Sequence, residues 1–572
     1  MTNPAASSPS RPSAVKTYIE LFTPKLVTIL REGYRFKEFR ADALAGVTVA
    51  IVALPLSMAI AIASGVEPAR GLYAAIIGGF LVSALGGSRF QIGGPAGAFI
   101  ILVAATVQKH GVDGLLLATF ISGFFLAAAG FLRLGTYVQL IPYPVTVGFT
   151  AGIAIVIFTS QIADLFGLTM EGGGGHGIVS TLEAAVASAP SANPYAIAVS
   201  LGTIVTILTL RRFAPRLPVI LIAVTGAGVV AALFNLPVET IGSRFGGIPN
   251  GLPPPSLPPI SLAKISAVLP DAFSFALLGS IESLLSATVA DAMTGRRHRS
   301  NCELAAQGVA NIASSIFGGL VVTGTIARTA TNVRAGAHGP VSGMLHSVFV
   351  LAFMIIAAPL ASYAPLAALA GVLAVVAWDM VERHAMASLM RSSMSDAAAL
   401  SATFLLTVFQ GLTQAIVAGV AIGALSFIQR MADSAALSSH GPLLQPDMPD
   451  APAGERTAYE AAAGERGVAV YRLSGAIFFG SAASLGAALD RVLSGQHTLI
   501  LDFSGAALVD SSGANAISGF IRKAERRGVN VVISGASPDV RRALVSGGLK
   551  APRVRYEVDL DEALSTAKTG AA

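Results

Sequence analysis

The chain carries little charge and almost no cysteine. Only 12% of its 572 residues are Asp, Glu, Lys or Arg, whereas soluble domains carry about 25%. Such a deficit leaves too little polar surface to cover a water-soluble body, so most of the chain is expected to face lipid. The single cysteine, Cys302, excludes an intramolecular disulfide, and the sequence therefore implies no oxidising compartment.

Patterns typical of enzymes and of nucleic-acid readers are also missing. The sequence has no His/Cys spacing for a metal, no nucleophile elbow and no glycine loop for a phosphate. We therefore expect no catalytic residue, no metal and no cofactor. The lack of an ATP-binding loop favours secondary transport or a channel over a pump. The net charge of +6 is interpreted as a membrane-topology signal, and no nucleic-acid partner is expected.

Apolar runs, by contrast, are abundant and recur from about residue 41 to residue 432. They predict an all-α polytopic membrane domain of about fourteen segments, several of them close to the roughly 20 residues that span a bilayer. Residues 1–40 are expected to form a cytoplasmic tail, because the chain begins with no apolar signal-peptide core. Arginines concentrate in the loops on the side of that tail, which places both termini in the cytoplasm.

Two segments, 95–109 and 325–335, are too short to cross a bilayer. They hold corresponding places in the two halves, and each follows a glycine-rich approach, Gly93–Gly97 and Gly318–Gly324. A matched pair of this kind predicts an inverted repeat in which two half-helices meet at the binding site. The alternative is that Gly and Pro only loosen ordinary membrane helices.

The start of each half-helix is a candidate anion site. Pro95 is expected in the first turn of one half-helix, where its missing N–H costs nothing. A helix N-terminus carries about half a positive charge, so two opposed ends favour an anion between them. The residues expected to line this site are Pro95, Ala96, Gly97, Ala98, Thr325 and Ile326.

Two ionisable residues inside apolar segments are further candidates. Arg328 would add a full positive charge to the anion site, or else it is a structural arginine that reaches the surface. Glu282 lies about twelve residues into a span that begins near Pro270, so it is roughly 18 Å deep. An unpaired carboxylate there would hold a coupling H⁺ or Na⁺, and Ser286 would support a cation. The alternative is a static ion pair between Glu282 and Arg328.

The composition changes after residue 432. Residues 433–465 are rich in Pro, Gly, Ala and charge and predict a linker. Residues 466–566 predict a small α/β domain, because strand-like runs such as Val468–Leu473 and Thr498–Asp502 alternate with helical stretches.

The sequence resembles the SulP sulfate-permease family from about Glu38 to Ile428, and beyond that the STAS domain that follows in this family. The motifs that carry the resemblance are Ser64–Tyr73, Gly86–Ala98, Ile281–Ala287, Ser300–Leu304 and Ala327–Gly336. The resemblance implies a seven-plus-seven repeat, a homodimer and elevator-like movement. It also implies an anion between the third and tenth segments, with Ser57 and Glu282 completing the pocket.

Two positions depart from the pattern of this family. Many members have Gln and an aromatic residue where this chain has Leu56 and Ile60. With these two apolar residues, the first segment resembles that of the bacterial branch of the family that transports C4-dicarboxylates aerobically.

The C-terminal domain contains one candidate regulatory turn, Val509–Ala514. It resembles the turn at which anti-sigma-factor antagonists are phosphorylated, at the start of a helix, which makes Asp510, Ser511 and Ser512 candidate regulatory residues. The alternative is that a serine caps the helix as plain structure. In this family the STAS resemblance also implies packing and the binding of a cytosolic protein.

The combined prediction is a secondary active transporter of sulfate or a similar dianion, coupled to H⁺ or Na⁺. It would be a multi-pass protein of the bacterial inner membrane with lipid as its surroundings. The alternatives are transport of C4-dicarboxylates (succinate, fumarate, malate) or bicarbonate, and a STAS-based signalling scaffold. A nucleobase carrier is disfavoured by Arg328 and by the Asp510–Gly513 turn.

Overall fold

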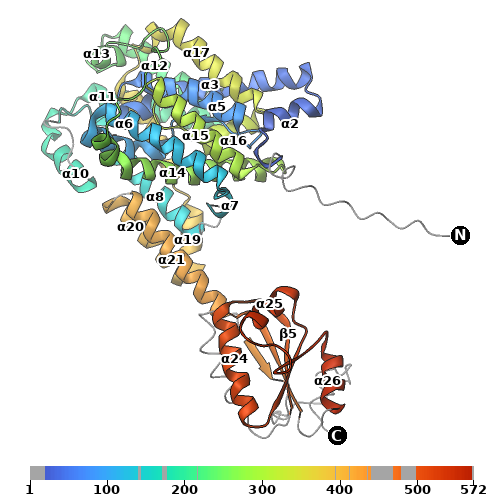
Figure 1. Cartoon of the computed structure of the whole chain (residues 1–572). Coiled ribbons are helices and arrows are strands. Elements are labelled where there is room, and N and C mark those ends of the chain that lie inside the picture. Colours follow the sequence, from blue (N-terminus) through green and yellow to red (C-terminus); the bar gives the residue numbers. More distant parts are fainter. Residues whose placement is uncertain are drawn as a thin grey trace. The chain divides into compact units, whose positions relative to one another are not determined.

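The computed structural model describes residues 20–138, 143–170, 177–214, 217–392, 394–410, 412–433, 436–439, 468–477 and 498–569. Residues 1–19 of the expected N-terminal tail and most of the expected linker lie outside these residues. The chain divides into two compact units, Met1–Val420 and Ala421–Ala572. The first is helical and the second contains a sheet with helices (Figure 1), so the predicted fold class is confirmed.

The first half of the membrane unit begins with a short helix, α2, before the apolar segments. Its elements are α2 (Lys25–Glu32), α3 (Phe36–Ala63), α4 (Pro68–Tyr73), η1 (Ala74–Gly78), α5 (Gly79–Leu85), β1 (Gly93–Gly94), η2 (Gly97–Phe99), α6 (Ile100–Phe131), α7 (Gly135–Val138), α8 (Tyr143–Ser160), α9 (Ile162–Phe166), α10 (Ile178–Ala187), η3 (Ala189–Ser191), α11 (Pro194–Phe213), α12 (Val219–Leu233) and α13 (Ile241–Phe245).

The second half opens with the long helix α14. Its elements are α14 (Leu262–Thr294), α15 (Ser300–Ile316), β2 (Thr323–Gly324), α16 (Ile326–Arg334), α17 (Val341–Ala361), α18 (Leu366–Met380), α19 (Arg383–Ser392), α20 (Met394–Phe409) and α21 (Leu412–Asp433). In the described chain, seven helical segments are long and apolar enough to cross a membrane, and they are Phe36–Ala63, Pro68–Leu85, Gly97–Phe131, Tyr143–Phe166, Pro194–Phe213, Leu262–Thr294 and Val341–Ala361.

Two short extended segments from the two halves meet inside the membrane unit. β1 pairs antiparallel with β2, Gly93 opposite Gly324 and Gly94 opposite Thr323. This pairing satisfies backbone groups that neither water nor a helix would satisfy at that depth. Helix α16 leaves one end of the pair as a half-helix. The other half-helix starts at η2 and continues in α6 as far as a break at Gly111, where φ is 67° and the backbone is not helical. This break lies just after residue 109, where the sequence predicts that the short segment ends.

Aromatic packing holds the start of the first half-helix. Phe99 of η2 lies edge-on against Phe275 of α14, with ring centroids 6.1 Å apart, and both side chains are fully buried. Strand β1 contacts α5 and η1 of the first half, and strand β2 contacts α14 of the second. The strand pair is therefore packed against helices of both halves.

The second unit is a five-stranded sheet with helices on both faces. Its strands are β3 (Ala436–Ser439), β4 (Val468–Ile477), β5 (Thr498–Val509), β6 (Asn530–Ser534) and β7 (Arg555–Glu557), in the order β3-β4-β5-β6-β7 and parallel except for β3. Its helices are α24 (Ser511–Arg526), α25 (Pro538–Ser546) and α26 (Leu560–Thr569). Leu499 and Leu501 belong to the core of one face and Ile500 to that of the other, as the period of two in a strand requires.

Candidate functional site

Hydrogen bonds between the residues that flank β1 and β2 reinforce the pairing of these two strands. The N–H of Thr325 donates to the carbonyl of Ile92 at 3.0 Å. The N–H of Ile92 donates to Oγ1 of Thr329 at 3.1 Å. That hydroxyl also accepts from Ser286 of α14 at 3.0 Å. The crossing of the two segments is therefore a fixed frame from which both half-helices start.

Arg328 is the third residue of α16, and its guanidinium points into this frame. The side chain is 1% exposed. Its Nη2 donates to Oγ of Ser57 at 3.1 Å and to the carbonyl of Pro95 at 3.3 Å. Its Nε and Nη1 have no partner among the described residues. Since no carboxylate of the described chain lies within 4.0 Å, the positive charge of Arg328 is uncompensated, which is a costly arrangement in a protein interior.

The structure brings three predicted residues into direct contact: Ser57 in the C-terminal third of α3, Pro95 and Arg328. Ala96 and Ala98 lie beside them and are 3% and 2% exposed. The surface alternative for Arg328 does not fit this geometry, because the guanidinium is directed inward. The contact between Ser57 of α3 and Arg328 of α16 depends on the tertiary structure, and no local sequence pattern predicts it.

Pro95 lies elsewhere than the sequence predicted. Helical turns begin at Gly97, with Ala96 as the N-cap, so Pro95 precedes the half-helix. It contributes its carbonyl oxygen to Arg328 instead of a first-turn position. Extended backbone continues past β1 because the glycines there pair with β2, which delays the start of the helix.

The second half-helix differs in a similar way. Thr325 is the N-cap of α16, yet its N–H is already bound to Ile92 and cannot reach a ligand. Ile326 and Ala327, the next two residues, are exposed, and first-turn N–H groups have no partner within their own helix. The donors left for a ligand are therefore those of the first turn after Thr325, together with the guanidinium of Arg328.

Gly94 is a site residue that the sequence reading did not single out by itself. A Cβ at this position would overlap Nη1 of Arg328. The glycine run before Pro95 carried the signal, because glycine is the residue that lets backbone come close to another group.

Glu282 of α14 is partly buried and has no hydrogen bond or ion pair with any described residue. The predicted alternative, a static ion pair with Arg328, is therefore absent from this structure. Ser286, one turn further along the same face, donates to Thr329 and not to Glu282. Glu282 thus remains available for a proton or a cation, whereas Ser286 belongs to the frame of the crossing.

The predicted regulatory turn of the second unit begins α24. Asp510 is the N-cap of this helix, and its Oδ1 accepts from the N–H of Gly513 at 2.7 Å. The capping residue is thus the aspartate and not a serine, because a carboxylate both accepts from the free N–H and opposes the positive helix end. Ser511 and Ser512 begin the helix, and their side chains lie outside the described ones.

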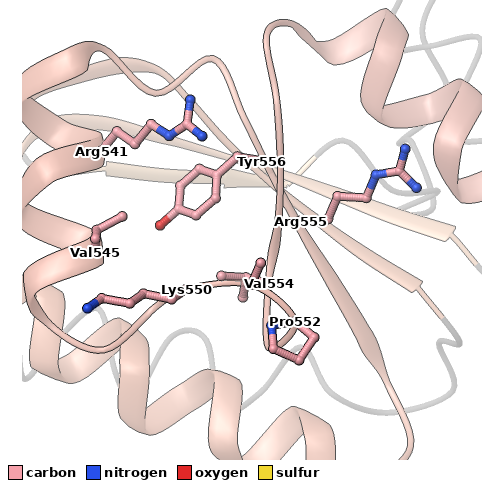
Figure 2. Close-up of a pocket in the computed structure, with 8 residues that line it drawn as sticks. Arg541, Val545, Lys550, Pro552, Val554, Arg555 and Tyr556 are labelled. Atoms are coloured by element: carbon pink, nitrogen blue, oxygen red, sulfur yellow. The ribbon is translucent and has the colours of Figure 1, made fainter.

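The second unit also has an open cleft of about 430 Å³ between α25 and β7 (Figure 2). The residues that line it are Arg541, Val545, Lys550, Ala551, Pro552, Val554, Arg555 and Tyr556. The guanidinium of Arg541 lies 4.9 Å from the ring centroid of Tyr556, and burial raises the pKa of Tyr556 to about 12. The lining is basic and contains no acidic residue. Sequence reasoning missed this cleft, because its cations come from three separate elements.

Comparisons with known proteins agree with the sequence resemblance. The sulfate permease family matches residues 39–403, and the STAS domain matches residues 460–562. A Bacillus subtilis protein provisionally named sulfate transporter YvdB is 39% identical over 91% of this chain and 95% of its own. The bicarbonate transporter BicA of a Synechocystis species is 31% identical over 89% of this chain and 90% of its own.

Solved structures give the same result for the fold. The murine anion transporter Solute Carrier 26 family member A9 aligns with a TM-score of 0.83 over 99% of this chain and 97% of its own, at 20% identity. The transmembrane domain of a cyanobacterial BicA aligns with a TM-score of 0.61 over 68% of this chain and 98% of its own, at 30% identity. The chain shares the fold of these proteins.

Proposed function

This chain belongs to the sulfate permease family of anion transporters, and from that membership we propose that it moves a small oxyanion across a membrane by secondary active transport. The observation that supports the proposal is Arg328, a buried guanidinium between the starts of two half-helices, two nitrogens of which have no partner among the described residues. An anion bound there would supply the missing counter-charge and would meet the positive ends of both helices.

We propose sulfate or a similar dianion as the substrate. The free edge of a guanidinium presents a planar fork that suits two oxygens of one oxyanion, and the relative YvdB carries a sulfate-transporter name. Bicarbonate is the second candidate, because the relatives named BicA are bicarbonate transporters. The buried apolar residues Leu56 and Ile60 of α3 favour a C4-dicarboxylate as the third.

We propose Glu282 as the residue that binds the coupling H⁺ or Na⁺. The helix that carries it, α14, is hydrogen-bonded to the residues that lead into β1 and to the first turn of α16. Ser283 accepts from the amide of Gln91 at 2.7 Å, and Ser286 donates to Thr329 at 3.0 Å. A change in the charge of Glu282 would therefore act on the helix that holds the two half-helix starts together. Such a link is the physical requirement for coupling one bound ion to another.

The proposal extends to the setting of the protein. We propose a homodimer in a bacterial inner membrane with both termini in the cytoplasm, as the family resemblance and the distribution of arginines suggest. The STAS domain would then meet cytosolic proteins. Its basic cleft, with Arg541 and Lys550 on either side of Tyr556 (Figure 2), suits an acidic group of such a partner.

The test is uptake into vesicles that contain the purified protein. Labelled sulfate, bicarbonate and succinate are offered in turn, with no gradient, with an inward proton gradient and with an inward sodium gradient. We expect one of these anions to accumulate above its external concentration under one of the two gradients. If none enters faster than into empty vesicles, transport of these anions is disproved and the signalling scaffold becomes the better account.

A further inference from the structure

A second carboxylate of the membrane unit, that of Glu303 on α15, is bonded to Gln91, whose side chain lies against Gly324 of β2. Glu303 is 0% exposed. Its Oε2 accepts from the N–H groups of Gly87 at 2.8 Å and Ser88 at 3.0 Å. Its Oε1 accepts from the side-chain amides of Gln91 at 2.9 Å and Gln307 at 3.2 Å. Within the described chain, no cation lies within 4.0 Å of it.

This environment fits an ionised carboxylate that serves only as an acceptor. Four N–H groups converge on its two oxygens, which is a charge-assisted arrangement. Glu303 also lies in the first turn of α15, where the helix end favours a negative charge. Glu282, which is only partly buried, has none of these donors among the described residues. The two carboxylates therefore differ: Glu282 has no partner in the described chain, whereas Glu303 is bound by four N–H groups of the protein itself.

The donors that bind Glu303 come chiefly from residues 87–91, the segment that leads directly into β1. This segment can approach α15 because it starts with glycine: a Cβ on Gly87 would overlap the carbonyl oxygen of Arg299. The N–H of Arg299 also donates to the carbonyl of Gly87 at 3.0 Å. Residues 87–91 are thus held against the first turn of α15 at several points.

Residues 87–91 are joined to the anion site by the next four residues of the chain, so a shift of this segment would also shift Pro95. The side chain of Gln91 lies where a Cβ on Gly324 of β2 would be, so it packs against the crossing itself. The next residue, Ile92, is bonded to Thr325 and Thr329 of the second half. Pro95, three residues later, holds Nη2 of Arg328.

We infer that Glu303 is a positioning residue for the anion site: its carboxylate fixes residues 87–91 and thereby the place of Pro95 and the first half-helix relative to Arg328. The inference rests on the proposed function and extends it to a residue that does not touch the substrate. Removal of the Glu303 carboxylate would then displace Pro95 and the first half-helix, although every group that binds the anion would still be present.

The test compares Glu303→Ala and Gln91→Ala with the wild-type protein in two measurements. One is backbone hydrogen exchange of residues 87–94, which needs no substrate. The other is the dissociation constant of labelled sulfate, bicarbonate or succinate. Gln91→Ala removes the amide that donates to Glu303 and leaves the carboxylate in place. This variant decides the test if Glu303→Ala fails to insert into the membrane. Ser315→Ala is the matched control, because this buried α15 hydroxyl donates only within its own helix, to Ile312.

We expect both variants to exchange faster at residues 87–94 and to bind the anion about tenfold or more weakly, since a displacement of about 1 Å at a site is that costly. We also expect the loss to be smaller in an Arg328→Lys background, where the fork that needs precise placement is already gone. Unchanged exchange overturns the inference, whatever the protein transports. Faster exchange with unchanged affinity overturns it as well, because Glu303 would then be structural only. A wild-type protein that binds none of the anions refutes the proposed function, and with it the inference.

Discussion

At the scale of single residues, the decisive feature is a buried positive charge that no described carboxylate neutralises. Ser57 and Pro95 offer Arg328 two neutral acceptors and no negative charge. A buried charge without a partner of opposite sign is strongly destabilising to a fold. The natural explanation for its retention is a ligand that completes the pair.

Replacement of Arg328 by alanine is therefore expected to weaken anion binding while the protein still inserts. The loss should be about ten- to hundredfold in the dissociation constant, the equivalent of roughly 1.5–3 kcal/mol for one hydrogen bond to a charged group. Arg328→Lys should recover only part of it, because a point charge replaces a planar fork. Binding of labelled sulfate, bicarbonate and succinate to purified protein measures this. Undiminished affinity in Arg328→Ala would remove the residue from the site.

Glu282 gives a second prediction at this scale. If its carboxylate carries the coupling proton, Glu282→Gln imitates the protonated form permanently. This variant should bind and exchange the anion but should not accumulate it under an inward proton gradient. Affinity and gradient-driven uptake are measured on one preparation. Normal proton-driven accumulation by Glu282→Gln would contradict proton coupling, and loss of sodium-driven accumulation alone would identify Na⁺ as the coupling ion.

At the scale of elements, the site depends on how closely β1 approaches α16. Gly94 lies against the guanidinium of Arg328, and only a hydrogen atom fits between the backbone and Nη1. The paired segments, the two half-helix starts and the hydroxyl of Thr329 form one hydrogen-bonded frame. A small change in β1 is therefore expected to act on the binding site without touching the substrate.

Gly94→Ala should displace the guanidinium and reduce anion affinity about as strongly as Arg328→Ala does, because the added Cβ takes the place of Nη1. Gly226→Ala is the control. Gly226 lies within α12, nothing surrounds the position of its Cβ, and alanine favours a helix over glycine. Both variants are compared in the binding measurement and in thermal stability. Equal affinities for the two would show that β1 does not constrain Arg328.

At the scale of the whole molecule, each unit has its own core. Phe99 and Phe275 belong to the large buried cluster of the helical unit. Leu501, Phe503 and Ile521 belong to another within the sheet unit. All residues assigned to the anion lie in the first unit, and membrane helices satisfy their own backbone groups.

Deletion of residues 435–572 is accordingly expected to leave insertion and anion binding intact. Transport should fall but not vanish, because the binding site lies within the membrane unit. Binding of the labelled anion and its uptake are measured on the truncated and full-length proteins side by side. A correctly inserted truncated protein with no detectable binding would show that the site requires the STAS domain.

Much of this could be predicted from the sequence, because the signals are local. Apolar runs, paired glycine-rich breaks and a charge within each of two segments indicate a membrane transporter with opposed half-helices whatever the packing is. Alternation of strands and helices after residue 466 indicates the small α/β domain in the same way. The family motifs then add the expectation of an anion.

Other features were decided only by the tertiary structure, because they depend on partners that are far apart in the chain. Ser57 and Arg328 are 271 positions apart, and Gln91 and Glu303 are 212 apart. No local pattern states that Pro95 offers a carbonyl, that Ser286 bonds to Thr329, or that Glu282 has no hydrogen-bond or ion-pair partner in the described chain while Glu303 is saturated with donors. The sequence determines which polar and charged side chains lie in apolar segments. Only the packing of the helices determines which of these side chains have a hydrogen-bond or ion-pair partner.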